Sequence, residues 1–158
     1  MKPFLFIAAL GAFAAPALAS DDPGAMLAVS EAYARSANPA SGAAFMLIAN
    51  HGPQSCVLTE VRSDVAERVE LHTHQEDAQG VMRMTEIEGG IEIAAGKEAV
   101  LERGGDHVML LGLHAPLAQG DQFTATLDFG DCGEVELDLE VDNERTVSHG
   151  AQAGAHSH

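Results

Sequence analysis

The feature that most constrains this chain is a two-residue alternation of apolar and acidic side chains near its end. Between Gly133 and Val141, the apolar residues Val135, Leu137 and Leu139 alternate with Glu or Asp. Successive side chains of a β-strand point to opposite faces, so the pattern predicts a strand with one buried face and one acidic, solvated face. An amphipathic helix would need apolar residues three or four positions apart, which this segment does not have.

The same alternation recurs earlier in the chain. Residues 123–129 alternate in the same way, and the turn-forming residues 130–133 join them to the final strand, which predicts a β-hairpin. A second hairpin is predicted over residues 86–93, with Gly89-Gly90 in its tight turn. Residues 63–68 are expected to form a single short turn of helix. The other expected strands are residues 27–33, 43–50, 56–61, 68–72, 81–85, 99–102 and 107–113.

These short strands are separated by Gly and Pro, and no window carries a sustained 3.6-residue period. Many short strands at regular spacing predict an all-β fold, an antiparallel β-sandwich or barrel. We assign this domain to residues 20–142. Residues 143–158 contain almost no apolar side chain beyond Ala and Val, which predicts a flexible tail that carries His149, His156 and His158.

The first 19 residues have the pattern of a secretory signal peptide. Lys2 precedes an apolar run, and Ala17-Leu18-Ala19 has the small-x-small form of a signal-peptidase site. A membrane anchor is the weaker interpretation, because Pro16 interrupts the run and the run is short for a span. We therefore expect export with cleavage after Ala19 and no membrane span in the mature protein.

Composition excludes several classes of protein. The chain has 24 Asp and Glu against 8 Lys and Arg, a formal net charge of −16, and so it should repel nucleic-acid phosphates. Hydrophobic residues make up 46% of the chain, which excludes a disordered acidic tail. Two cysteines are too few for a disulfide-rich scaffold or a four-cysteine zinc site. No arrangement of nucleophile and base is recognisable, so we do not expect an enzyme.

Histidine and methionine occur in pairs at alternate positions of the expected strands, so the members of each pair share a face. The pairs are His72 with His74, Met82 with Met84, and His107 with Met109. Thioether sulfur is a soft, uncharged ligand that suits Cu(I) and binds Mg²⁺ or Ca²⁺ poorly, and zinc prefers Cys, His and carboxylate. The set therefore predicts a Cu(I) site. The competing interpretation is a secreted sandwich in which the Met residues fill the core and the His residues are solvated.

Several stretches of the chain resemble the PCu(A)C family of bacterial periplasmic copper chaperones. The matching stretches are residues 44–50, 69–74, 80–84, 107–113 and 116–121. The family motif is a His, a Met some way downstream, and then His-x-Met. In this sequence it falls on His72, Met84, His107 and Met109.

The resemblance implies a cupredoxin-like β-sandwich that binds one Cu(I) near its surface with these four residues. It also implies that the protein delivers copper in the periplasm to the respiratory oxidase, with an oxidase subunit or a thiol-bearing assembly chaperone as the acceptor. We expect the protein to be a monomer. The family often has Met directly after the first His, where this chain has Thr73. His74 therefore stays an alternative to His72, and Met82 an alternative to Met84.

Some family members carry a His- or Met-rich C-terminal extension that binds Cu(II). His149, His156 and His158 resemble a sparse version of it. This leaves a second function open, a periplasmic copper-buffering or tolerance protein that captures Cu(II) with its tail and its acidic surface.

Cys56 and Cys132 are the only cysteines in the chain. In an oxidising compartment they are expected to form a disulfide. The alternative is a pair of free thiols that binds copper or reduces Cu(II).

Overall fold

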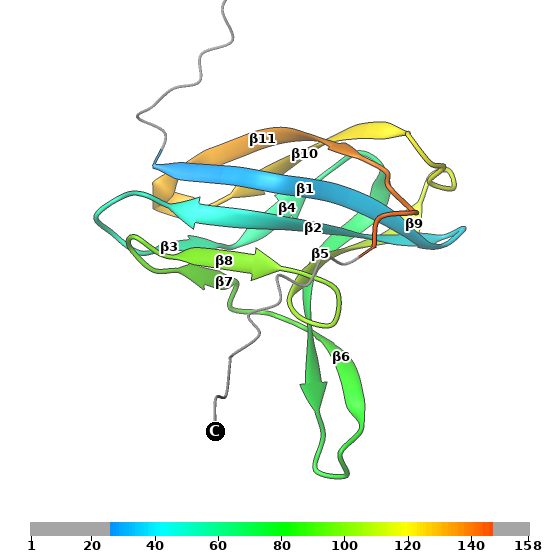
Figure 1. The fold of residues 1–158 in the computed structure, drawn as a ribbon, viewed down its shortest axis with the longest axis horizontal. Helices are drawn as coiled ribbons and strands as arrows, with labels where there is room; N and C mark the ends of the chain where they lie inside the picture. The colour runs from blue at the N-terminus through cyan, green and yellow to red at the C-terminus, as the bar shows by residue number, and fades with distance from the viewer. Residues whose placement is uncertain (1–25, 147–158) are drawn as a thin grey trace, which may run out of the picture.

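The computed structural model describes residues 26–146, and this part of the chain is all-β, as predicted, with no α-helix (Figure 1). A single 3₁₀ turn, η1 (Gly130–Cys132), is its only helical element. The strands are β1 (Leu27–Asn38), β2 (Ser41–Asn50), β3 (Cys56–Leu58), β4 (Glu60–Arg62), β5 (Ala66–Glu76), β6 (Met82–Glu86), β7 (Ile91–Ile93), β8 (Glu98–Leu101), β9 (His107–Leu113), β10 (Gln122–Asp128) and β11 (Glu134–Glu140).

The strands form a cupredoxin-like antiparallel β-sandwich. The largest sheet has the order β1-β2-β9-β5-β6, with β8 also paired to β2. A second sheet has the order β11-β10-β4, and β3 pairs with β7. Within residues 26–146, every strand ladder is antiparallel, and a single parallel bridge joins Ala34 to Val141.

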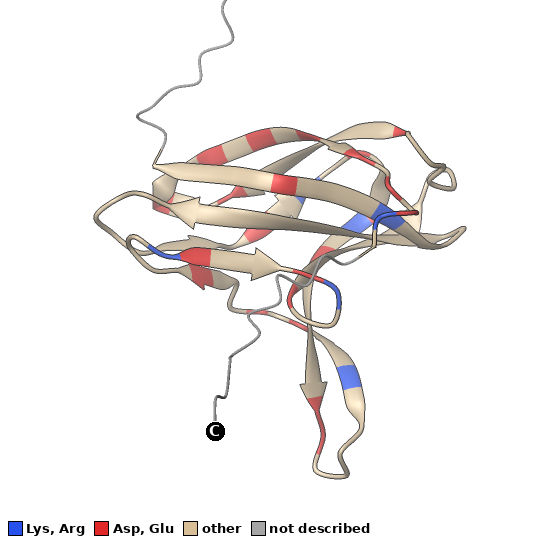
Figure 2. Cartoon of the chain, in the orientation of Figure 1, with Lys and Arg blue, Asp and Glu red and all other residues tan. Residues whose placement is uncertain are grey.

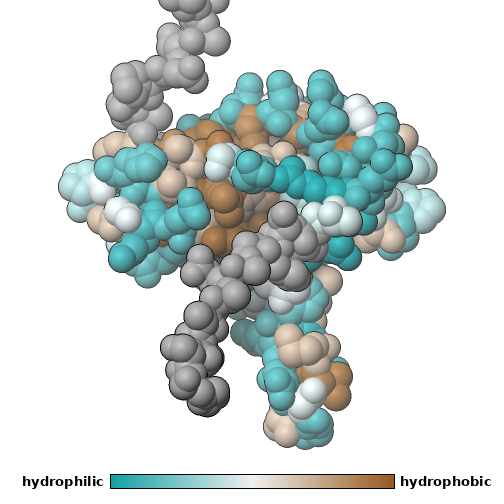
Figure 3. All heavy atoms as spheres, in the orientation of Figure 1, coloured by the Kyte–Doolittle hydropathy of each residue, from teal (hydrophilic) through white to brown (hydrophobic). Residues whose placement is uncertain are grey.

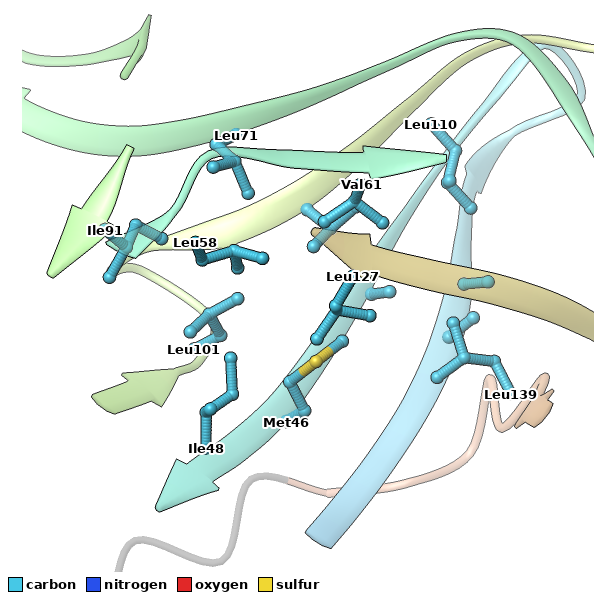
Figure 4. Packing of buried hydrophobic residues seen from close by; sticks show 14 of the residues in the cluster. Met46, Ile48, Leu58, Val61, Leu71, Ile91, Leu101, Leu110, Leu127 and Leu139 are labelled. Carbon is cyan, nitrogen blue, oxygen red and sulfur yellow. The ribbon is translucent and has the colours of Figure 1, made fainter. Parts of the chain in front are cut away.

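The hydrophobic core lies between the two larger sheets (Figure 4). Met46 and Leu110 enter it from the large sheet, and Val61, Leu127 and Leu139 enter it from the second sheet. The side chains of Leu127 and Leu139 are almost completely buried, and they come from the two segments with the clearest alternation. The acidic residues of β11 are exposed, as the alternation predicts, and Figure 2 marks acidic positions along this strand.

The hairpin predicted at the end of the chain is confirmed. β10 and β11 pair over seven residues, with Phe123 opposite Leu139 and Leu127 opposite Val135. η1 occupies the connection, and Gly130 and Gly133 have the positive φ angles that this tight turn requires.

The second predicted hairpin, over residues 86–93, is wrong. Its first residue, Glu86, ends β6, which pairs with β5, and Ile91–Ile93 form β7, which pairs with β3. Gly90 does turn the chain, with φ at 78°. Ile91 and Ile93 are buried opposite Leu58 and Cys56. Because this burial favours pairing with β3, β7 does not pair with β6.

Two further local expectations also fail. Residues 63–68 form no helical turn, because the chain turns at 64–65 and β5 begins at Ala66. Residues 56–61, expected as one strand, divide into β3 and β4, which pair with β7 and β10 respectively. β5 is longer than expected: it pairs with β9 as far as His72 and with β6 from His72 to Glu76. Its end therefore projects from the sandwich together with β6 (Figure 1).

Cys56 and Cys132 are joined by a disulfide that links β3 to η1, with their Cα atoms 5.9 Å apart. No helix within residues 26–146 is long and apolar enough to cross a membrane. The predicted signal peptide and the tail histidines His149, His156 and His158 lie outside the described residues. The predicted boundary after Asp142 stays a prediction. Just beyond it, the backbone carbonyls of Asn143 and Arg145 accept hydrogen bonds from the Arg35 guanidinium of β1.

Candidate metal site

The four motif residues come from three strands of the large sheet, β5, β6 and β9. His72 lies directly opposite His107, and His74 lies directly opposite Met84. Residues opposite each other in a ladder share a face, as do residues two apart in one strand. His72, His74, Met84, His107 and Met109 therefore all lie on one face of the sheet. The other face of β5 and β9 is the one that enters the core.

His107 is the buried member of the set, with 3% of its surface exposed. Its Nδ1 lies 2.9 Å from the carbonyl oxygen of Gly105, which can only accept a hydrogen bond. Nδ1 therefore carries the proton, and Nε2 keeps its lone pair free for a metal. Burial lowers the pKa of His107, and the nearby His74 and His72 lower it further. The neutral, metal-binding form is thus favoured at this position.

The rings of His72 and His74 both lie near that of His107. Their centroids are 6.0 Å and 5.4 Å from that of His107. The Nδ1 of His74 is 3.5 Å from the same Gly105 carbonyl oxygen. His72 differs: its Nε2 is 2.8 Å from Oε2 of Glu70, and its Nδ1 is buried without a hydrogen-bond partner.

A surface pocket of about 530 Å³ opens where these strands meet. Its lining includes both predicted methionine ligands and two of the histidines. The lining residues are Ala37, Ala43, Phe45, His74, Met84, Arg103, Gly104, His107 and Met109. His72 lies beside the pocket rather than in its wall. Met82 lies opposite Glu76 near the tip of the projecting hairpin and does not line the pocket.

The pocket offers thioether sulfur as a metal donor beside imidazole. Among the described residues, no three His, Cys, Asp or Glu side chains are grouped so that they could hold a metal ion. Met84 and Met109 supply two soft donors in the same pocket as the free Nε2 of His107. Such a donor set fits Cu(I) and fits zinc or a hard cation poorly.

Phe45 and Arg103 are among the pocket residues that the sequence alone did not indicate. Phe45 packs with its ring centroid 6.1 Å from that of His107 and 5.2 Å from that of Tyr33. Arg103 lies in the loop that precedes β9 and lines the pocket. The alternation of β2 places Phe45 and Ala43 on one face. Which residues of other strands lie beside them depends on pairing between distant segments.

The projecting hairpin of β5 and β6 carries exposed apolar side chains. Met84 is 46% exposed, and Val81 and Met82 on the same projecting hairpin are also exposed. Figure 3 shows apolar colour on this projection below a mostly hydrophilic surface. An exposed thioether beside a buried imidazole leaves the pocket open to an incoming metal or acceptor.

Known proteins are similar to this chain in sequence or in fold. A putative lipoprotein, Lxx21020, of Leifsonia xyli subsp. xyli (strain CTCB07) is 35% identical over 103 residues, which cover 65% of this chain and 61% of the relative. The chain thus matches less than two thirds of that relative's length.

Solved PCuAC domains have the same fold. The copper-bound PCuAC domain from PmoF2 is 20% identical, with a TM-score of 0.60 over 74% of this chain and 92% of that domain. DR1885 from Deinococcus radiodurans, in its copper-free form, is 26% identical, with a TM-score of 0.57 over 90% of this chain and 96% of that one. Its Cu(I) form is 28% identical, with a TM-score of 0.52 over 73% of this chain and 79% of that one. The fold implied by the sequence resemblance is therefore confirmed.

The family model described as putative lipoprotein LpqE-like matches residues 27–141, which include all of the strands β1 to β11 and all four motif residues. This chain belongs to the LpqE-like family and has the fold of a PCuAC domain.

Proposed function

We propose that this protein is a copper chaperone that binds one Cu(I) through His72, Met84, His107 and Met109. The observation that carries the proposal is the pocket in which two thioethers meet an imidazole with a free Nε2. That donor set is neutral and soft, as Cu(I) prefers. The copper-bound and Cu(I) forms of structurally similar proteins support the same metal.

The partly open site suits a carrier that must release its metal. Met84 is exposed while His107 is buried, so an acceptor can approach the copper from the thioether side. Transfer through a shared-ligand intermediate needs such access. We propose that the acceptor is an oxidase subunit with a copper centre, or a thiol-bearing chaperone that assembles it, in the periplasm. Export is consistent with the lipoprotein family, and the acceptor is inferred from the PCu(A)C resemblance.

The geometry bears differently on the two open choices of ligand. Met84 is preferred to Met82, because only Met84 lines the pocket. His72 is preferred to His74 on the motif, although His74 is nearer to His107 and lines the pocket. The buried lone pair on Nδ1 of His72 has no other partner, and a bound cation would satisfy it.

The test is Cu(I) titration against a competing chelator. The wild-type protein should bind one equivalent, and the double variant Met84→Leu, Met109→Leu should lose that binding, because leucine keeps the volume and removes the sulfur. Met82→Leu is the matched control and should bind as the wild type does. His72→Ala and His74→Ala, compared directly, identify the first ligand. Unchanged affinity in the double methionine variant would remove this site.

A further inference from the structure

Glu70 is not one of the four motif residues, yet its side chain makes a short polar contact with the motif residue His72. Glu70 precedes His72 by two residues in β5 and therefore shares its face of the sheet. Oε2 of Glu70 lies 2.8 Å from Nε2 of His72. The two side chains are only 18% and 14% exposed, so water competes weakly for this bond.

The carboxylate of Glu70 has a second polar partner besides His72. Oε1 of Glu70 accepts a hydrogen bond from the guanidinium of Arg68 at 2.7 Å. Glu70 also lies directly opposite Met109 in the neighbouring strand β9. The carboxylate is thus held between an arginine and a histidine beside one of the proposed copper ligands.

This geometry decides which nitrogen of His72 carries the proton. An ionised carboxylate can only accept a hydrogen bond, so Nε2 of His72 must be the donor. In the neutral ring, Nδ1 then holds the lone pair, and it is the same Nδ1 that lies buried with no partner. His107 is the reverse case, because its Nδ1 donates to the carbonyl of Gly105 and its Nε2 is free.

We infer that Glu70 is a positioning residue that makes His72 bind copper through Nδ1, while His107 binds through Nε2. This inference rests on the proposed function. Metal-binding histidines commonly donate their second nitrogen to a carboxylate or carbonyl, which fixes the ring and makes the ligating nitrogen more basic. Glu70 fills this role for His72, and the carbonyl of Gly105 fills it for His107.

The copper-free arm of the test uses nuclear magnetic resonance of the imidazole rings. The wild-type protein should show a His72 Nε2–H proton that is protected from solvent exchange by Glu70. Glu70→Ala should lose this protection. Glu70→Gln should retain it, because the amide oxygen still accepts, and Glu76→Ala, in the same strand and on the same face, should leave it unchanged. A protected proton that persists in Glu70→Ala would overturn the inference.

The copper-loaded arm uses the same spectra, since Cu(I) is diamagnetic. The ¹⁵N shifts should identify Nδ1 of His72 and Nε2 of His107 as the ligating nitrogens. Glu70→Ala should weaken Cu(I) binding by about 10- to 100-fold, as the loss of a residue that orients a metal ligand typically does, and Glu76→Ala should not. Ligation of His72 through Nε2 in the wild type would overturn the inference. A wild-type protein that binds no Cu(I) would instead refute the proposed function, and the copper-free arm would still decide the role of Glu70.

Discussion

Removal of the disulfide between Cys56 and Cys132 tests how the sandwich is held together. The bond links β3 to η1, near the end of the sandwich away from the projecting β5–β6 hairpin (Figure 1). Cys56 is buried beside the core, so alanine is the appropriate replacement at both positions. Neither residue lines the metal pocket.

The expected loss follows from the length of chain that the bond closes. The two cysteines are 76 positions apart. In the chain-entropy account, closing a loop of that length lowers the conformational entropy of the unfolded state. The free energy of unfolding rises by about 4.5 kcal/mol as a result. Domains of this size have free energies of unfolding of roughly 5–15 kcal/mol, so the loss is a large share of the total.

The assay is urea unfolding of the copper-free protein followed by far-ultraviolet circular dichroism. With a denaturant dependence of about 2 kcal/mol/M, the double variant Cys56→Ala, Cys132→Ala should unfold at about 2 M less urea than the wild type. The wild type measured in reductant should approach the variant. The variant should keep its Cu(I) affinity, because the ligands lie on other strands. If the midpoint of the variant decreased by less than about 0.5 M urea, which corresponds to roughly 1 kcal/mol, the entropic reasoning would be refuted.

Two further predictions concern pH and the backbone. Because burial lowers the pKa of His107 below its ordinary value of 6.5, the unfolded chain binds more protons than the fold as pH falls below 6.5. The free energy of unfolding without copper should therefore decrease from pH 6.5 down to the lowered pKa. This dependence should weaken in His107→Gln and persist in His114→Gln, and equal dependence in both variants would contradict it. Gly90 has a positive φ, and a Cβ there would lie 2.5 Å from the carbonyl oxygen of Leu58, so Gly90→Ala should destabilise the fold by roughly 1–3 kcal/mol. The neighbouring Gly89→Ala, which meets no atom within 4 Å, should have little effect in the same urea assay.

Where the sequence predicted the fold correctly, the information was local. The alternation on either side of residues 130–133 was enough to predict β10, β11 and the turn between them. The same reasoning failed at residues 86–93, although Gly90 does form a turn there. The flanking residues pair with β5 and β3 rather than with each other, and pairing between distant segments depends on burial in the finished core.

The candidate site was likewise predictable from the sequence only where the signal is local. The i, i+2 spacing placed His107 and Met109 on one face from the sequence alone. The register that sets His72 opposite His107, and His74 opposite Met84, joins three strands and has no local signal. Glu70 could have been noticed, because it shares the face of His72 two residues away. Its hydrogen bond depends on how deeply that part of β5 is covered.

The proposed function depends most on a Cu(I) ion held by both imidazole and thioether donors. X-ray absorption on the Cu(I)-loaded protein measures this donor set directly. We expect sulfur and imidazole nitrogen scatterers together in the wild type. A shell of nitrogen and oxygen alone in the wild type would contradict it.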